Sequence, residues 1–294
     1  METVKEIVVI SGKGGTGKTS LVAALASLFA DKVMVDCDVD AANLHMILQP
    51  ERIIRQSGFA GGKQAAIDLA LCTSCGVCRD VCRFDAISSD FIVDPFSCEG
   101  CGACYLFCPA NAVNFSAHIA GHWYVADTGN HGRFVFAELL PGEDNSGKLV
   151  AAVRNEARVE AESAGKRLII IDGPPGIGCP VISSMTGANL VIVVTEPTPS
   201  GIHDLERVIA LTKHFRIRAV VVVNKCDINP SSLAAIKKYC DAGYHTFLGE
   251  IPYETAITEA QRAGKTIVDY SPGCDASGAI RSIHTKLQSI LEEI

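Results

Sequence analysis

The chain has 294 residues, which suffices for one large α/β domain and a small additional module. Hydrophobic residues make up 48% of it and aromatic residues only 6%, so the apolar content is mostly aliphatic, as buried parallel strands require. A formal net charge of -7 argues against a general nucleic-acid-binding protein, which needs a basic face. The longest apolar runs have the length of strands, whereas a membrane span needs about 20 residues. We therefore expect a cytoplasmic protein with no membrane insertion and no nucleic-acid partner.

Strands and helices are predicted to alternate along the chain. The first apolar strand covers 4–10 and leads through a Gly-rich turn into a helix over 19–30. Further strands are predicted at 32–36, 123–128, 133–139, 168–172, 190–195 and 219–224, and further helices at 146–164, 201–215, 230–242, 254–263 and 275–292. This alternation predicts an α/β fold, a doubly wound and mostly parallel sheet with helices on both faces. The pattern breaks near Phe59 and returns beyond His118.

Eight of the 13 cysteines lie in one short window inside this break. Two copies of C-x2-C-x2-C-x3-C align at a period of 26 residues, which indicates an internal duplication. Such spacing lets one loop reach three corners of an iron–sulfur cube, while the fourth thiolate comes from the other copy. The predicted ligands of two 4Fe–4S clusters are therefore Cys72, Cys75, Cys78 and Cys108 for one, and Cys98, Cys101, Cys104 and Cys82 for the other.

Two structural zinc sites are the alternative for these cysteines, although zinc is usually bound by separated C-x2-C pairs. Pro109 after the second copy fits the bacterial ferredoxin pattern, whereas Arg83 stands where the first copy would carry proline. We therefore expect a small α+β ferredoxin-like module over 59–118. The other five cysteines are expected to be small buried hydrophobic residues; Cys179 has the alternative of sharing a cluster.

A phosphate-binding loop lies between the first strand and the first helix. The segment Gly12-Lys13-Gly14-Gly15-Thr16-Gly17-Lys18-Thr19 fits G-x-x-x-x-G-K-[ST], and Ser20 continues it into the helix. Its backbone N–H groups are expected to surround phosphate oxygens at the positive end of the helix. Lys18 is expected to reach the β- and γ-phosphates, and Thr19 to bind Mg²⁺.

The loop, with its early lysine, resembles that of the deviant Walker A superfamily, which includes the MinD and ParA ATPases. Together with the cysteines, nearly the whole chain resembles MinD-superfamily P-loop ATPases that carry an inserted two-cluster ferredoxin domain. The resemblance implies that Lys13 contacts the nucleotide of a partner subunit, so that ATP lies between the two copies of a homodimer. The alternative for Lys13 is a solvated loop lysine.

The resemblance extends to the ends of three later strands. Asp38 matches the aspartate that orients or deprotonates the attacking water, so the implied catalytic residues are Lys13, Lys18 and Asp38. Asp36 and Asp40 are neighbours of unassigned role. Asp172 is implied to hold the Mg²⁺ shell, Asn224 to contact adenine and Pro252 to lie in the loop that covers the base. Asp227 leaves GTP open, because its carboxylate could accept the two N–H donors of guanine.

These interpretations divide the chain into a P-loop ATPase domain at 1–58 and 119–294, and an inserted ferredoxin module at 59–118. The favoured function is an ATPase in which nucleotide-driven dimer closure is coupled to electron transfer through two 4Fe–4S clusters. A second is a maturation or activation factor for a metalloenzyme, so a redox or metalloenzyme partner is expected in either case. A ParA/MinD-like positioning ATPase with structural clusters is a third. The acidic tail, ending in Glu292-Glu293-Ile294, lacks the basic amphipathic helix with which MinD binds membranes.

Overall fold

The computed structural model describes residues 4–143 and 146–294; residues 1–3, where the first predicted domain begins, and 144–145 lie outside the described part. The chain divides into two compact units. We call the first, residues 1–56, 123–138 and 146–294, the nucleotide unit, and the second, residues 57–122 and 139–145, the cysteine unit. The predicted module at 59–118 falls inside the second.

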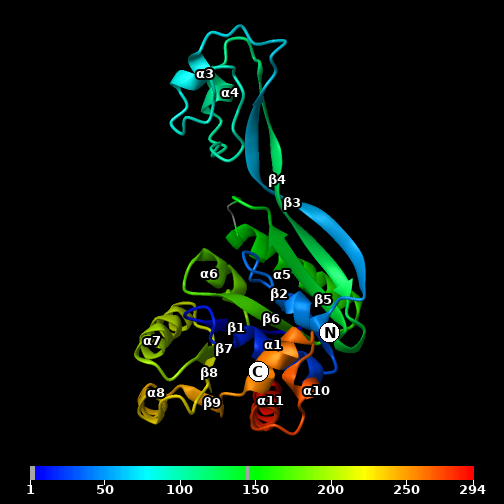
Figure 1. Cartoon of the computed structure of the whole chain (residues 1–294), viewed down its shortest axis with the longest axis vertical. Helices are drawn as coiled ribbons and strands as arrows, with labels where there is room; N and C mark the ends of the chain where they lie inside the picture. Colours follow the sequence, from blue (N-terminus) through cyan, green and yellow to red (C-terminus); the bar gives the residue numbers. More distant parts are fainter. Residues whose placement is uncertain (1–3, 144–145) are drawn as a thin grey trace. The chain divides into compact units, whose positions relative to one another are not determined.

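Nine strands form one sheet in the order β3-β4-β5-β2-β6-β1-β7-β8-β9 (Figure 1). From β5 to β9 every neighbouring pair is parallel. The strands are β1 (Lys5–Ser11), β2 (Lys32–Asp36), β3 (Arg52–Ile67), β4 (Val113–Asp127), β5 (Arg133–Leu139), β6 (Leu168–Pro175), β7 (Leu190–Thr195), β8 (Ala219–Asn224) and β9 (Thr246–Ile251). The predicted mostly parallel α/β fold is confirmed.

The helices connect these strands and cover the sheet. They are α1 (Lys18–Leu28), α2 (Leu44–Leu48), α3 (Val77–Asp80), α4 (Ala103–Phe107), α5 (Ser146–Ser163), α6 (Cys179–Met185), α7 (Pro199–His214), α8 (Pro230–Ala242), α9 (Thr255–Arg262), α10 (Ile267–Tyr270) and α11 (Asp275–Glu293), with a 3-10 turn, η1, at Gly129–His131. Helices α5, α6 and α7 pack against β2, β6 and β7, and α11 packs against β9 and α1.

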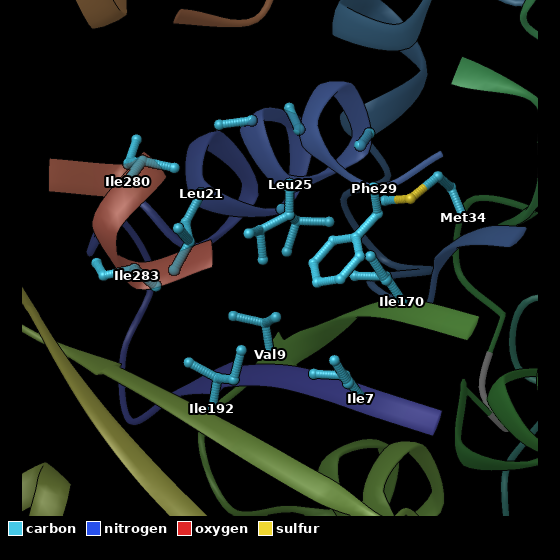
Figure 2. Close-up of a cluster of buried hydrophobic side chains, with 14 of the residues drawn as sticks. Ile7, Val9, Leu21, Leu25, Phe29, Met34, Ile170, Ile192, Ile280 and Ile283 are labelled. Carbon is cyan, nitrogen blue, oxygen red and sulfur yellow. The ribbon is translucent and has the colours of Figure 1, made fainter. Parts of the chain in front are cut away.

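The core of the nucleotide unit lies between the sheet and α1, α10 and α11. Figure 2 shows Ile7 and Val9 of β1 facing Leu21 and Leu25 of α1. The alternate residue Ile10 turns to the opposite face, where Gly173 separates it from α6. Because β1, β6 and β7 are buried on both faces, they are apolar almost throughout, which is why the sequence predicts them well.

The backbone of the cysteine unit repeats at the 26-residue period predicted from the cysteines. Gly76 and Gly102 both have positive φ, at 84° and 75°, and each precedes a short helix, α3 or α4. The same period relates two hydrogen bonds, from Asp94 N to Ala86 O and from Asp68 N to Ala112 O. The unit is therefore a structural duplication.

The sequence misplaced several boundaries of regular structure. β3 and β4 are much longer than any strand expected there, and β9, after α8, was missed altogether. β3 is exposed along most of its length, so it lacks the apolar run on which the prediction depended. In β9, Gly249 and Glu250 interrupt the apolar pattern.

Candidate nucleotide-binding and cysteine sites

A cleft of about 650 Å³ opens in the nucleotide unit beside the phosphate loop. Its lining includes ten residues predicted from the sequence: Gly14, Gly15, Thr16, Gly17, Lys18, Thr19, Ser20, Asp38, Asn224 and Pro252. Gly12, Lys13 and Asp172, also predicted, do not line it. The cleft lies at the carboxyl ends of the parallel strands, where open α/β sheets bind ligands.

The phosphate loop is packed against the end of β8. Gly17 has φ of 85°, and a Cβ atom there would lie 2.1 Å from Asn224 Nδ2, so this position needs glycine. Asn224 Nδ2 donates a hydrogen bond to Thr16 O at 2.8 Å. Asn224 thus holds the loop in addition to facing the cleft, a contact that the sequence did not predict.

Lys18 is buried among carboxylates. Its Nζ lies 2.5 Å from Asp172 Oδ1 and 4.0 Å from Asp38 Oδ2. Burial by itself lowers the pKa of Lys18, but Asp172, Asp36 and Asp38 favour the charged form and the net pKa is raised. The structure therefore brings together three predicted residues, from the start of α1, the segment after β2 and β6.

Asp36 and Asp40, which the sequence could not distinguish, have different environments. Asp36 is fully buried, and its carboxylate accepts hydrogen bonds from the backbone N–H groups of Asp38, Asn43 and Leu44 at 3.0, 3.2 and 3.0 Å. Burial and the neighbouring Asp172 raise the pKa of Asp36 to about 7. Asp36 thus shapes the segment that carries Asp38, whereas Asp40 is exposed and lines the cleft.

Three buried polar atoms without a protein partner gather at this site: Thr16 Oγ1, Asp172 Oδ2 and Asn224 Oδ1. An unpaired buried polar atom is costly, so such atoms usually have a partner that is not a protein group. A carboxylate oxygen and a hydroxyl suit a hydrated Mg²⁺ ion, and an amide oxygen accepts an N–H donor. The orphaned atoms therefore fit a metal-bound nucleotide.

Two residues beside the loop were missed as site residues. Glu196, directly after β7, lies 3.1 Å from Lys13 Nζ and 2.5 Å from Lys225 Nζ. Lys225 also donates to Gly15 O at 3.1 Å. Lys13 is therefore a partly exposed lysine that does not line the cleft and is paired with a buried carboxylate. A lone glutamate in Glu196-Pro197 gives no sequence signal of this arrangement.

Asp227 does not line the cleft. Its Oδ1 accepts a hydrogen bond from Tyr253 N at 2.7 Å, next to Pro252. The Asp227 carboxylate is thus hydrogen-bonded to the backbone of the loop that follows β9.

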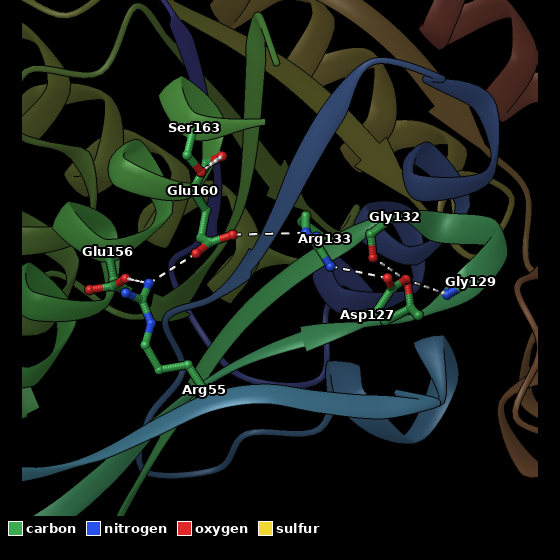
Figure 3. A network of polar contacts seen from close by, with 9 residues as sticks. Arg55, Asp127, Gly129, Gly132, Arg133, Glu156, Glu160 and Ser163 are labelled. Carbon is green, nitrogen blue, oxygen red and sulfur yellow. Dashed lines mark hydrogen bonds and ion pairs between the residues drawn. The ribbon is translucent and has the colours of Figure 1, made fainter. Parts of the chain in front are cut away.

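Helix α5 makes polar contacts with both α6 and β3. Arg154 of α5 donates to Ser183 O and Thr186 O, at the end of α6, at 2.7 and 2.9 Å. Two turns later along α5, Glu160 accepts from Arg55 of β3 at 2.9 Å, and Glu156 pairs with the same guanidinium (Figure 3). A chain of polar contacts therefore runs from the helix after the Asp172 strand to the base of β3.

Two small cavities in the cysteine unit are each lined by four cysteines. The first is lined by Cys82, Cys98, Cys101 and Cys104, and the second by Cys72, Cys75, Cys78 and Cys108. These are the two crossed sets expected from the spacing, brought together by the duplicated backbone. Apolar side chains such as Phe115 and Phe91 complete the linings.

No group of three or more His, Cys, Asp or Glu side chains among residues 4–143 and 146–294 converges closely enough to hold a single metal ion. A 4Fe–4S cube takes one thiolate at each of four separate irons, so its cysteines surround a cavity instead of meeting at one point. The thirteen cysteines all have free thiols. The ligand assignment remains a prediction.

Known proteins resemble the chain over most of its length. Residues 7–267 match the CobQ/CobB/MinD/ParA nucleotide binding domain. The chain belongs to this family. A protein of Methanocaldococcus jannaschii with no assigned function is 37% identical over 77% of the chain and 80% of its own length. The septum site-determining protein MinD of Neisseria meningitidis is 22% identical over 96% of the chain and 90% of its own length.

Solved structures of the CobQ/CobB/MinD/ParA family share the fold. MinD of Aquifex aeolicus superposes with a TM-score of 0.58 at 22% identity, covering 97% of both chains. MinD of Pyrococcus horikoshii, complexed with Mg-ADP, gives a TM-score of 0.59 at 17% identity over 98% of both chains. With its phosphate loop and the family match, the protein is a P-loop ATPase. In the described part of the chain, no helix is both long and apolar enough to span a membrane.

Proposed function

We propose that this ATPase couples ATP-driven association of two copies to electron transfer through two 4Fe–4S clusters held in the cysteine unit. The single observation that carries the proposal is the pair of cavities, each lined by a crossed set of four cysteines. In this assignment Cys72, Cys75, Cys78 and Cys108 hold one cluster, and Cys98, Cys101, Cys104 and Cys82 hold the other. When bound, such clusters take up and release single electrons.

The domain proposal follows from the same assignment. Residues 59–118 form the inserted ferredoxin module, and 1–58 and 119–294 form the ATPase domain. An insertion has two connections to the domain that carries it, and here both continue long strands, β3 and β4. Movement of those strands therefore reaches the cysteines directly.

Within the nucleotide site, we assign roles by chemistry. Lys18 leaves Asp172 to bind the β- and γ-phosphates, while Asp172 and Thr19 hold Mg²⁺ and its waters. Asp38, which lies 4.0 Å from the Lys18 ammonium, orients the attacking water. The backbone of Gly12–Ser20 surrounds the phosphates.

The base is adenine in this proposal. Asn224 Oδ1 is buried and unpartnered, so it suits the exocyclic amino group of adenine. Recognition of guanine would need the Asp227 carboxylate, which is engaged by Tyr253 N instead. Pro252, which lines the same cleft, would cover the base.

The homodimer proposal rests on Lys13. In this proposal, Lys13 of each copy contacts the nucleotide bound by the other, so that ATP lies between the two. Sequence similarity to MinD over nearly the full chain supports this arrangement.

The polar contacts of α5 support coupling between the two activities. The loop after Asp172 responds to Mg²⁺ and γ-phosphate in this proposal and leads into α6. Arg154 ties α6 to α5, and Arg55 ties α5 to β3, which continues into the cysteine unit. A shift of α6 is thereby passed to the strand that precedes the first cysteine.

An anaerobic redox titration tests this function, with ADP in one sample and a non-hydrolysable ATP analogue in the other. We expect the potentials to differ by about 40–130 mV, since allosteric couplings are typically about 1–3 kcal/mol. Arg55→Ala should reduce the difference. Arg218→Ala, which removes an exposed ion pair with Glu293, serves as the matched control. Equal potentials in the two wild-type samples would exclude nucleotide-gated electron transfer.

A ParA/MinD-like positioning ATPase is the second candidate, favoured by the similarity to MinD proteins. It predicts ATP-dependent dimerisation but equal cluster properties in both nucleotide states.

Activation of a partner metalloenzyme uses the same residues as electron supply, so the two functions differ only in the protein that accepts the electrons. Co-purification under anaerobic conditions, followed by assay of the partner before and after addition of ATP, separates the two.

A further inference from the structure

The Lys13–Glu196–Lys225 cluster has a feature that the ATPase reaction does not explain. Glu196 is 7% exposed and accepts from two lysines at once. Lys13 and Lys225 approach different oxygens, Oε2 and Oε1. One cation is enough to neutralise one buried carboxylate. The second lysine is therefore not required to neutralise Glu196, although it is paired with it.

The backbone fixes Glu196 in place. Thr198 N donates to Glu196 O at 2.8 Å, and a Cβ atom at Gly201 would lie 2.3 Å from the same oxygen. Glu196 is therefore pinned where β7 turns into α7. Its backbone therefore does not shift when a lysine moves away.

The two lysines differ in how firmly they are held. Lys225 has a second partner, since it also donates to Gly15 O at 3.1 Å. The Lys13 side chain is 38% exposed, and among the described residues Glu196 is the only partner of its ammonium. Lys13 can therefore leave at low cost while Lys225 continues to neutralise Glu196.

Burial raises the pKa of Glu196, but hydrogen bonds from Lys225 and Lys13 outweigh it and the net pKa is lowered. The carboxylate is thus charged and attracts Lys13 at neutral pH. Lys13 does not line the cleft of its own copy. To act on the nucleotide of a second copy, its ammonium has to exchange Glu196 for phosphate.

We propose that Glu196 is a positioning residue that retains the Lys13 side chain on its own copy in the free protein, and that Lys225 permits its release by remaining on Glu196. This inference rests on the proposed function, in which Lys13 acts at the nucleotide of a second copy. ATP-dependent dimerisation then includes the transfer of Lys13 from Glu196 to the phosphates.

The two partners of the cluster give opposite predictions for dimerisation. Glu196→Gln removes the charge that retains Lys13, so the dimer should form at about tenfold lower protein concentration, the ratio expected when one charge-assisted hydrogen bond is lost. Lys225→Gln keeps a donor for Gly15 O but leaves Lys13 as the sole cation on Glu196. Dimerisation should then weaken by about the same factor.

Sedimentation velocity with a non-hydrolysable ATP analogue at saturating concentration measures the dissociation constant of the dimer. Nucleotide affinity is measured separately. A residue with a merely structural role would weaken the dimer in both variants, in step with the melting temperature. The double variant Glu196→Gln/Lys225→Gln should recover the tight dimerisation of Glu196→Gln alone. Glu196→Gln that dimerises no more tightly than wild type, with nucleotide affinity intact, would overturn the proposal.

Lys13→Ala separates this inference from the proposed function. It should abolish ATP-dependent dimerisation in the wild-type and Glu196→Gln backgrounds alike. If Lys13→Ala dimerises normally, both the inter-subunit role of Lys13 and its retention by Glu196 are wrong. If Lys13→Ala fails to dimerise but the other variants behave as wild type, the retention by Glu196 alone is wrong.

Discussion

The two units are stabilised by different means. In the nucleotide unit, β2 and β7 are fully buried, β1 and β6 are buried at all but one residue, and one apolar cluster extends from α1 to α11. The cluster of buried residues in the cysteine unit has five members: Ala65, Cys78, Ile87, Cys104 and Val113. Two of the five are predicted cluster ligands. A unit of this size with so little apolar burial needs further stabilisation, which bound metal can supply.

The comparison predicts that removal of iron disorders the cysteine unit only, and this is the largest expected effect. Ligand binding and folding are coupled where a core is small, so apo-protein should lose its ordered cysteine unit. Hydrogen exchange after anaerobic chelation should increase throughout 57–122, while β1, β6 and β7 keep their protection. Cys179→Ser is the control, because Cys179 lies in the nucleotide unit and should change nothing. If the exchange rates over 57–122 are the same before and after chelation, the cysteine unit folds without metal.

The nucleotide unit should respond to a single buried charge instead. Lys18→Ala should abolish ATP turnover, because it removes the cation that binds the phosphates. It also leaves Asp172, which is completely buried, without its partner, so the free energy of unfolding should fall by about 3–5 kcal/mol. Urea denaturation and an ATPase assay measure the two effects. Asp172→Asn in the same chain should restore stability but not turnover, and recovery of both would refute the assignment of Lys18.

Asp38→Ala should separate binding from hydrolysis. The loop that holds Asp38 is fixed by Asp36, which the substitution leaves in place. Nucleotide affinity should therefore stay within about threefold of wild type, while turnover falls by about 10²–10⁴, the usual contribution of general acid–base catalysis. Fluorescent-nucleotide binding and single-turnover kinetics test this. Hydrolysis at the wild-type rate would show that another group orients the water.

The last prediction concerns the pH dependence of stability and rests on Lys32 at the start of β2. Burial and the nearby Lys166 lower the pKa of Lys32 from 10.5 to about 8. The unfolded chain binds a proton that the folded chain releases between these values, so stability contributed by this group rises from about pH 8 to 10.5. Lys32→Met should remove that rise. Denaturation midpoints of both proteins across this window provide the test, and parallel curves would contradict it.

The sequence predicted most accurately the strands that are buried in the nucleotide unit. Strands 32–36, 190–195 and 219–224 match the structure residue for residue, because strands that are buried along almost all of their length consist mainly of consecutive apolar residues. The long β3 escaped prediction because its residues are mostly exposed. Glu196 and Lys225 escaped because an ion pair between distant segments leaves no local pattern in the sequence.

Iron analysis tests the central claim, two 4Fe–4S clusters on crossed cysteine sets, most directly. Protein purified without oxygen should contain about eight irons and eight sulfides per chain, since eight thiolates line two cavities. The reduced protein should give the EPR signal of two interacting clusters. Cys78→Ser and Cys104→Ser should each lower the iron content by about half, through different cavities. Stoichiometric zinc without iron–sulfur absorption would contradict the account.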